Sequence, residues 1–188
     1  MQLHKFKKLN FGFGILAPEQ NIGAITCTIR SIKNNFPGAP FICVVTSNIS
    51  SDSMKEISEI CTVYKGKNTI TSLMNTAMRM GHKEWNLLVM EGAIVISGIV
   101  GKFSIFIEEE TDVLFPIVME YNRKGEPEII KNRFPEASLN GTFIHQQTFK
   151  NIGDFPDHES IMESKLWWAG QAISKETRFK AILGTKLV

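Results

Sequence analysis

The sequence lacks the long apolar run of a membrane-spanning helix. No stretch of its 188 residues approaches the ~18 to 20 consecutive apolar residues that cross a bilayer. The basic start, MQLHKFKKLN, is followed only by a short apolar run with glycines and a proline, too brief for a signal peptide. We therefore expect no membrane span and a cytoplasmic location, in the host cytoplasm if the chain is viral.

The sequence also has little net charge and few cysteines. The formal charge is +2, far from the dense positive field typical of nucleic-acid-binding proteins, so we expect no nucleic-acid partner. Cys27, Cys43 and Cys61 have no metal-binding spacing and lie in apolar periodic stretches, which predicts reduced core residues. A dinucleotide site is disfavoured, because Gly12 and Gly14 lie within a predicted strand and lack the G-x-G-x-x-G spacing.

The first half of the chain alternates strand and helix periodicities. Short apolar runs at 11–16, 41–45, 62–64 and 85–90 predict strands; the run at 41–45 is typical of a strand covered on both faces, and the run at 85–90 of a buried strand. Helical patterns separate them: one behind a cap at Asn21, one opened by the capping box Ser53–Glu56, and one over Ile70–Met78. This order predicts an α/β fold, with a mostly parallel sheet and helices on both faces.

The pattern changes from Asp112 onward. After a predicted helix at 99–107, Val113–Val118 and Ile129–Ile130 predict a small antiparallel insertion around a turn at 122–125. A strand at 139–144, helices at 146–151 and 159–173, and a strand at 179–183 follow. We find no linker or internal repeat, so residues 1–188 are predicted to form one domain, which would bury roughly two-thirds of its unfolded surface.

Four loops are the expected ligand site. In open α/β sheets ligands bind beyond the carboxyl ends of the parallel strands. That rule selects the loops at 17–19, 46–48, 65–68 and 91–93.

These loops belong to segments that resemble the GT-A glycosyltransferases, especially the large inverting family numbered two. "GILAPEQNIGAITCTIRSI" is similar to the family's opening strand, loop and first helix, and "FICVVTSN" resembles its second strand. "KNTITSLMNTAMRMGHKEWNLLVMEGA" is similar to the helix and strand that end in its D-x-D motif. "SLNGTFIHQQTFKNIGDFP" resembles the acceptor-side segment, and "ESKLWWAGQAI" the helix that opens with a Glu-Asp pair.

The resemblance implies a nucleotide-diphosphate sugar as donor and an acceptor that the sequence does not identify. It places Ala17, Pro18 and Glu19 beside the nucleotide. Thr46 and Ser47 stand where an aspartate pair usually holds the base and ribose, and a hydroxyl there lacks the strength of a charged acceptor.

Two lysines and an asparagine complete the predicted substrate site. The resemblance places Lys67 near the diphosphate, and an ammonium group is a good phosphate partner. Lys186 stands near the position where several relatives offer a histidine, and it would neutralise the leaving diphosphate directly. Asn140, followed by Gly141, would let an acceptor approach the backbone closely.

The main departure from the family lies at the D-x-D motif, which reads Glu91-Gly92-Ala93. Mg²⁺ or Mn²⁺ prefers several hard oxygen ligands, so the single carboxylate of Glu91 would anchor such an ion weakly. This predicts weak or no metal dependence.

The predicted general base is Glu163, because Glu163-Ser164 stands where the family has Glu-Asp. Glu159 lies one turn earlier and is an alternative base. Carboxylates at a helix start also favour the helix dipole without any catalytic role. Trp167 and Trp168 are either sugar-stacking platforms or core residues. His145 is either an acceptor contact or a structural histidine.

The sequence leaves two functions open. The first is an inverting glycosyltransferase that moves a sugar from the nucleotide donor to an acceptor hydroxyl. The alternative is an inactive GT-A-like binding or structural module, because the departures fall on the residues that handle charge. The small size is similar to that of short transferase-like proteins of phages and bacteria. A nucleotidyltransferase is disfavoured, because no glycine-rich basic loop follows the first strand.

Overall fold

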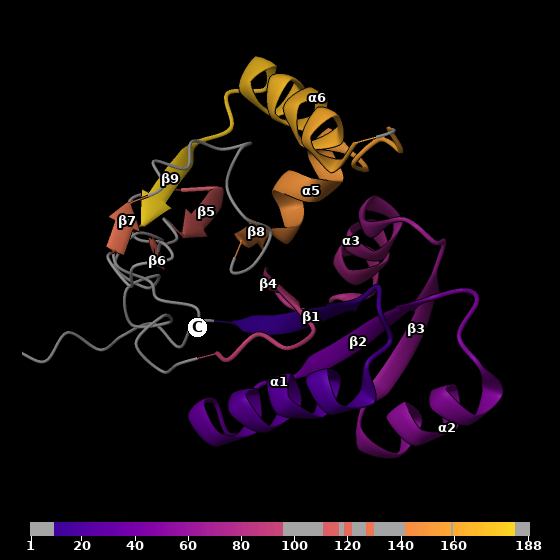
Figure 1. Ribbon diagram of the computed structural model, residues 1–188. Coiled ribbons are helices and arrows are strands. Elements are labelled where there is room, and N and C mark those ends of the chain that lie inside the picture. The colour runs from indigo at the N-terminus through magenta and orange to yellow at the C-terminus, as the bar shows by residue number, and fades with distance from the viewer. Residues whose placement is uncertain are drawn as a thin grey trace, which may run out of the picture.

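The computed structural model describes residues 10–95, 111–116, 119–121, 127–129, 142–158 and 160–182. Within these ranges, seven strands form one sheet in the order β3-β2-β1-β4-β8-β5-β9, and β6 pairs with β7 separately (Figure 1). The strands are β1 (Phe11–Ala17), β2 (Phe41–Thr46), β3 (Thr62–Gly66), β4 (Trp85–Met90), β5 (Val113–Pro116), β6 (Met119–Tyr121), β7 (Pro127–Ile129), β8 (Thr142–His145) and β9 (Phe179–Ile182). The helices are α1 (Ile22–Asn35), α2 (Ser51–Ile60), α3 (Ile70–Met80), α5 (Gln146–Ile152) and α6 (Ile161–Ser174).

The predicted parallel sheet is confirmed over the first four strands. β1 pairs in parallel with both β2 and β4, and β2 with β3, so the carboxyl ends of all four meet at one edge. β8 runs antiparallel to β4 and β5, while β5 and β9 are parallel. The sheet is therefore mostly parallel with one reversed strand.

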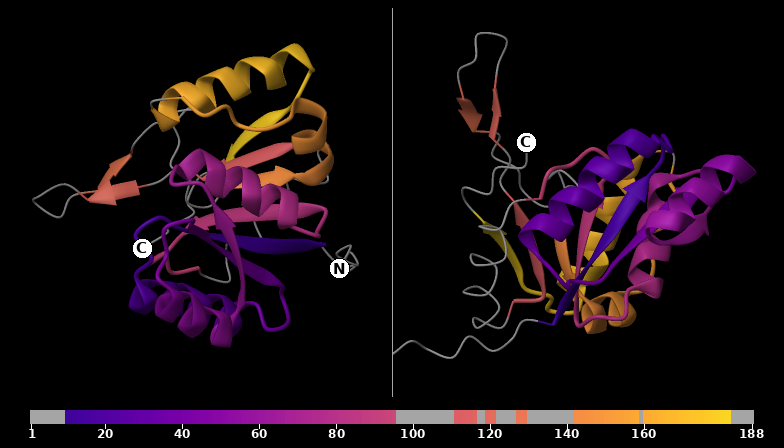
Figure 2. Two further views of the ribbon diagram at one scale, coloured as in Figure 1. Left: turned by 90° about the vertical axis from the view of Figure 1, so that its right-hand side faces the viewer. Right: turned by 90° about the horizontal axis from the view of Figure 1, so that it is seen from below.

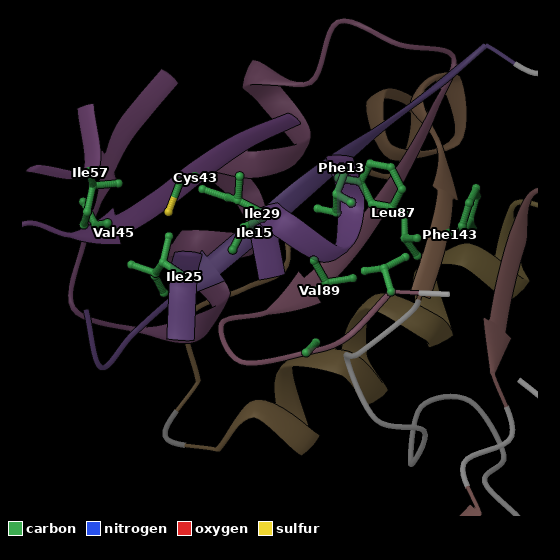
Figure 3. Close-up of a cluster of buried hydrophobic side chains, with 14 of the residues drawn as sticks. Phe13, Ile15, Ile25, Ile29, Cys43, Val45, Ile57, Leu87, Val89 and Phe143 are labelled. Carbon is green, nitrogen blue, oxygen red and sulfur yellow. The ribbon is translucent and has the colours of Figure 1, made fainter. Parts of the chain in front are cut away.

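Two apolar layers hold helices against both faces of the sheet. One joins Phe13, Ile15 and Val45 to α1 and α2, whose buried side chains include Ile25 and Ile57 (Figure 3). The other packs Leu16, Val44 and Leu88 against α3, α5 and α6. Alternate residues of the central strands thus enter opposite layers, which explains why these strands read as unbroken apolar runs.

Glycine lets α3 lie close to the sheet. A Cβ atom at Gly14 would stand 2.9 Å from the Cβ of Ala77, and one at Gly66 would stand 2.8 Å from Cδ2 of Leu73. Both distances are shorter than normal packing allows. These two positions therefore fix how α3 is seated across β1 and β3.

Two helix starts show how well capping was predicted. Asn21 caps α1 as expected, since its Oδ1 accepts the backbone N–H of Ala24 at 3.0 Å. The predicted start of α2 was wrong: the helix begins at Ser51, and Ser50 is its cap. The Oγ atom of Ser50 accepts the N–H of Ser53 at 3.1 Å, so Ser53 lies inside the first turn.

The antiparallel insertion is confirmed, but the expected pairing of β5 was wrong. Met119 pairs with Ile129 and Tyr121 with Pro127, so β6 and β7 form the hairpin. This hairpin stands away from the main sheet in both views of Figure 2. β5 instead joins the sheet between β8 and β9. The helix predicted at 99–107 lies outside the described residues.

Two further expectations differ from the structure. Cys43 is buried and Cys61 partly buried, but Cys27 is exposed, because it lies on the face of α1 opposite the buried Ile25 and Ile29. Lys65 and Gly66, predicted as loop, belong to β3 and pair with Val45 and Thr46. Within the described ranges, no helix is long and apolar enough to cross a membrane.

Candidate functional site

Glu91 ties the loop after β1 to the end of β4. Its Oε1 atom accepts the backbone N–H groups of Glu19 at 2.7 Å and Gln20 at 3.1 Å. Its Oε2 atom accepts the N–H of Asn21 at 2.8 Å. Three successive N–H groups thus point at one carboxylate, with Gln20 in the left-handed region at φ 57°. In this structure the Glu91 carboxylate holds the loop after β1 against the end of β4, and we call this arrangement the clamp.

Burial and hydrogen bonding shift the pKa of the Glu91 carboxylate in opposite directions. Burial raises the pKa of Glu91 above its ordinary value, while the N–H donors of Glu19, Asn21 and Gln20 act to lower it. Burial has the larger effect.

Gln20 extends the clamp to the loop after β2. Its Nε2 atom donates to Oγ1 of Thr46 and, at 2.8 Å, to Oδ1 of Asn48. The Thr46 hydroxyl in turn donates to Oδ1 of Asn48 at 2.6 Å. The loops after β1, β2 and β4 are therefore linked through two side chains, Glu91 and Gln20.

The loop after β3 joins the same cluster. Ser47 donates its hydroxyl to Oδ1 of Asn68 at 2.9 Å. The backbone N–H of Lys67 donates to Oγ of Ser72 in the first turn of α3 at 2.8 Å. The Lys67 side chain is exposed. The structure thus brings all four predicted loops together at the carboxyl edge of the sheet.

The predicted nucleotide contacts in the first loop differ in what they offer a ligand. Ala17 is fully buried, so only its backbone can reach a ligand. Pro18 is half-buried and the Glu19 side chain is exposed.

The described donor atoms do not match a tightly held metal ion. A divalent ion takes several oxygen ligands, whereas both carboxylate oxygens of Glu91 already accept backbone N–H groups. Within the described ranges, no group of three or more His, Cys, Asp or Glu side chains lies close enough to hold an ion. The role of Glu91 as a metal ligand stays a prediction.

Side chains of α3 hold the segment that leads into α6. Asn75 donates to the carbonyl of Phe155 at 2.8 Å and accepts its N–H at 2.9 Å. Thr71, in the first turn of α3, donates to Oδ1 of Asp157 at 3.0 Å. Because α3 begins beside the loop of Lys67 and Asn68, this pairing brings Asp157 close to the carboxyl edge.

Glu163 lies in the first turn of α6, capped by Ser160. Ser160 Oγ accepts the Glu163 N–H at 3.1 Å, and the Glu163 side chain is exposed. Ser164 is fully buried and donates its hydroxyl to the carbonyl of Pro156. Of Glu163 and Ser164, Glu163 therefore carries the accessible group.

Several predicted residues lie outside the described residues or away from this edge. Asn140, Glu159 and Lys186 are outside them. His145 lies at the opposite edge of the sheet, because it pairs with Trp85 at the start of β4, so it is no acceptor contact at this site. Trp168 is a core residue that stacks on Phe155 at 4.6 Å, whereas Trp167 is 46% exposed.

Sequence reasoning missed Gln20, Asn48 and Asp157. Gln20 directly follows the selected loop at 17–19, and Asn48 lies in the selected loop at 46–48 but was not named as a contact, so loop position alone was the available signal. Asp157 follows no strand, and its position depends on the pairing with Thr71. No local pattern could have identified it.

No protein-family model and no curated protein matches the chain. Solved structures do match. TarS from S. aureus, residues 1–349, superimposes with a TM-score of 0.66 at 20% identity, over 94% of this chain and 59% of that TarS fragment. The same TarS chain in complex with UDP gives 0.65 at 18% identity. The bifunctional IspDF from Campylobacter jejuni gives 0.63 at 10% identity, over 94% of this chain and 50% of IspDF.

The chain has the GT-A-type fold. At such identities the similarity shows the fold alone, which is that of nucleotide-sugar transferases and of related nucleotidyltransferases. The chain spans less than two-thirds of the TarS and IspDF chains. In this GT-A-type chain the linked loops lie at the edge where α/β sheets bind ligands.

Proposed function

We propose that this protein is an inverting glycosyltransferase that transfers a sugar from a nucleotide-diphosphate sugar to an acceptor hydroxyl. The observation that supports this most is the linkage of four loops at the carboxyl edge, three of them through Glu91 and Gln20 and the fourth through the bond from Ser47 to Asn68. A protein of the same fold, TarS, has been crystallised with UDP. The resemblance of the loop segments to family-two transferases adds to both.

The proposed nucleotide contacts come from the loops after β1, β2 and β3. The backbone of Ala17, with Pro18 and Glu19, would flank the base. Ser47 is exposed and would offer its hydroxyl, while Thr46 is buried and bonded to Gln20 and Asn48. We therefore extend the site to the side-chain amides of Gln20 and Asn48, which the nucleotide would meet at the surface.

The proposed transfer is a single displacement at the anomeric carbon. The acceptor oxygen forms a bond to that carbon and its proton passes to the Glu163 carboxylate. The bond from the carbon to the diphosphate oxygen breaks, and the nucleoside diphosphate leaves with its electron pair. Asn140 would lie beside the acceptor.

Basic side chains would stabilise the leaving diphosphate. The Lys67 side chain is exposed beside the clamped loops, and Lys186 is proposed as its partner. An Mg²⁺ or Mn²⁺ ion bound through Glu91 would supply the same kind of charge stabilisation. Because both Glu91 oxygens hold the loop, we propose that metal dependence is weak or absent.

Thermal unfolding with a panel of nucleotide sugars, with and without Mn²⁺, tests the donor site. A ligand at 100 times its dissociation constant stabilises the folded state by about 2.7 kcal/mol. We expect a rise in the unfolding temperature with at least one donor without metal, and its loss in Lys67→Ala. Lys55→Ala, an exposed lysine on α2, is the matched control. No shift with any donor would overturn the proposal.

Turnover separates the transferase from the inactive module. Glu163→Gln keeps size and hydrogen bonding but removes the base, so we expect donor binding to persist and donor hydrolysis or transfer to fall by ~10²-fold or more. Donor binding without measurable turnover by the unsubstituted protein would favour the non-catalytic module instead.

A further inference from the structure

A polar cavity lies at the amino edge of the sheet, opposite the proposed nucleotide site. It has a volume of about 520 Å³. Among the described residues that line it are Arg79, His82, Lys83, Glu84, His145 and Lys150. The start of β1, the end of α3, the turn before β4 and the start of α5 thus contribute to one hollow.

The lining has more positive than negative charge. Arg79 is held by Asp154, with its Nε atom 3.2 Å from Oδ1. Among the ion pairs of the described residues, none includes Lys83 or Lys150. Glu84 is the one carboxylate among the described lining residues, and it faces Nε2 of His145 at 3.5 Å. Lys83 and Lys150 therefore line the cavity without an ion-pair partner among the described residues.

Hydrogen bonds join the turn before β4 to the start of α5 beside the cavity. Asn86 is 3% exposed and donates to Oε1 of Gln146 at 2.7 Å. Gln146 donates from Nε2 to the carbonyl of Met78 at 3.0 Å and from its backbone N–H to the carbonyl of Glu84 at 2.7 Å. The turn before β4 and the start of α5 are thus bonded together, and both contribute residues to the cavity lining.

This cavity is separate from the carboxyl-edge loops. The six residues of β4, Trp85–Met90, stand between the turn at Glu84 and the clamp at Glu91. At about 3.3 Å per residue the two sites are about 20 Å apart. A ligand of this volume therefore cannot occupy both.

We propose that the amino-edge cavity binds a small phosphorylated anion. Its described lining contains asparagine, arginine, glycine, histidine, lysine, glutamate and glutamine but no apolar side chain, so it suits a strongly hydrated ligand. Lysine ammonium groups are compact charges that pair well with phosphate oxygens. The volume falls within the range of small-molecule sites. Lys83 and Lys150 are the main contacts.

Isothermal titration of the full chain with inorganic pyrophosphate tests this assignment. We expect saturable binding with one site, and a rise in Kd of about tenfold in each of Lys83→Ala and Lys150→Ala, as for loss of one charge-assisted contact. Lys55→Ala removes the same charge from α2 and should leave Kd unchanged. Citrate, a non-phosphorylated anion of high charge, should bind at least tenfold more weakly.

A second experiment distinguishes binding at this cavity from binding at the proposed nucleotide site. Binding of pyrophosphate should persist in Lys67→Ala and in the presence of UDP, whether or not UDP itself binds. Titration with glucose 1-phosphate distinguishes a sugar phosphate from a free phosphate as the natural ligand, according to which binds more tightly. The proposal is overturned if neither pyrophosphate nor glucose 1-phosphate binds saturably at 10 mM (about the weakest affinity of interest). It is also overturned if the Kd for pyrophosphate rises equally in Lys55→Ala, if citrate binds with equal affinity, or if Lys67→Ala loses pyrophosphate binding.

Discussion

The Oε2 atom of Glu91 accepts the backbone N–H of Asn21 at 2.8 Å, so the end of β4 is bonded to the residue that caps α1. The carboxylate of Glu91 is thereby a structural part of the loop beside it. Changing Glu91 should alter stability as well as any activity, and this separates a clamp from a residue that serves only as a metal ligand.

Glu91→Gln should lower the free energy of unfolding by about 1–2 kcal/mol. The single oxygen of glutamine can keep the N–H groups of Glu19 and Gln20, but its amide group then faces the N–H of Asn21. Chemical denaturation without added metal measures the change, with Glu56→Gln on the exposed side of α2 as control. An unchanged free energy would contradict the clamp.

Gln20→Ala should weaken nucleotide binding about tenfold and alter the free energy of unfolding by less than about 1 kcal/mol. The substitution removes the side-chain bonds to Thr46 and Asn48, which couple two loops near the protein surface. Titration calorimetry with UDP gives the affinity. Gln171→Ala, exposed on α6, should change neither quantity. A large loss of stability with unchanged affinity would indicate a purely structural bridge.

Glu91 was identified from the sequence and Gln20 was not, and this difference shows what the sequence could predict. The strands at 41–45 and 85–90 and the helix behind Asn21 followed from apolar periodicity and capping, and the carboxyl-edge rule then selected loops that the structure brings together. Hydrogen-bond partners did not follow, because the reach of Gln20 to Asn48 depends on how neighbouring loops curl. Ser50 was likewise hidden, since several serines at 50–53 can cap a helix.

Long-range pairing also limited the prediction. β8 was expected as a strand, but its antiparallel place between β4 and β5 depends on contacts far apart in sequence, such as Trp85 with His145 and Val113 with Ile144. That pairing moves His145 to the amino edge. The basic cavity there could not be anticipated, because Lys83 and Lys150 are 67 positions apart and meet only through it.

Asn75→Ala should lower the free energy of unfolding by about 1–3 kcal/mol, because the N–H and carbonyl of Phe155 both lose their partner. Thr71→Val removes the bond of the hydroxyl to Asp157, an exposed residue, and its contact with the Thr69 hydroxyl at 3.2 Å, and should cost less. Denaturant titration of both variants gives the ranking. The reverse order would show that Asp157, and not Asn75, fixes the approach to α6.

Lys165 should make stability depend on alkaline pH. Burial lowers the pKa of Lys165 to about 8 from its ordinary 10.5. Between these values the unfolded chain binds a proton that the folded chain does not, so the free energy of unfolding should rise with pH in this window. The rise should be absent in Lys165→Met and retained in Lys55→Met. Parallel curves for the protein and Lys165→Met would refute it.

The most direct test of the account is an NMR titration of the ¹⁵N-labelled chain with UDP. The account predicts saturable shifts of the amide signals of Glu19, Gln20, Asn21, Ser47 and Asn68, the residues linked at the carboxyl edge. The signals of Gly81 and Lys83 at the opposite edge should stay in place. Shifts confined to that opposite edge, or none at millimolar UDP, would contradict the assignment of the nucleotide site.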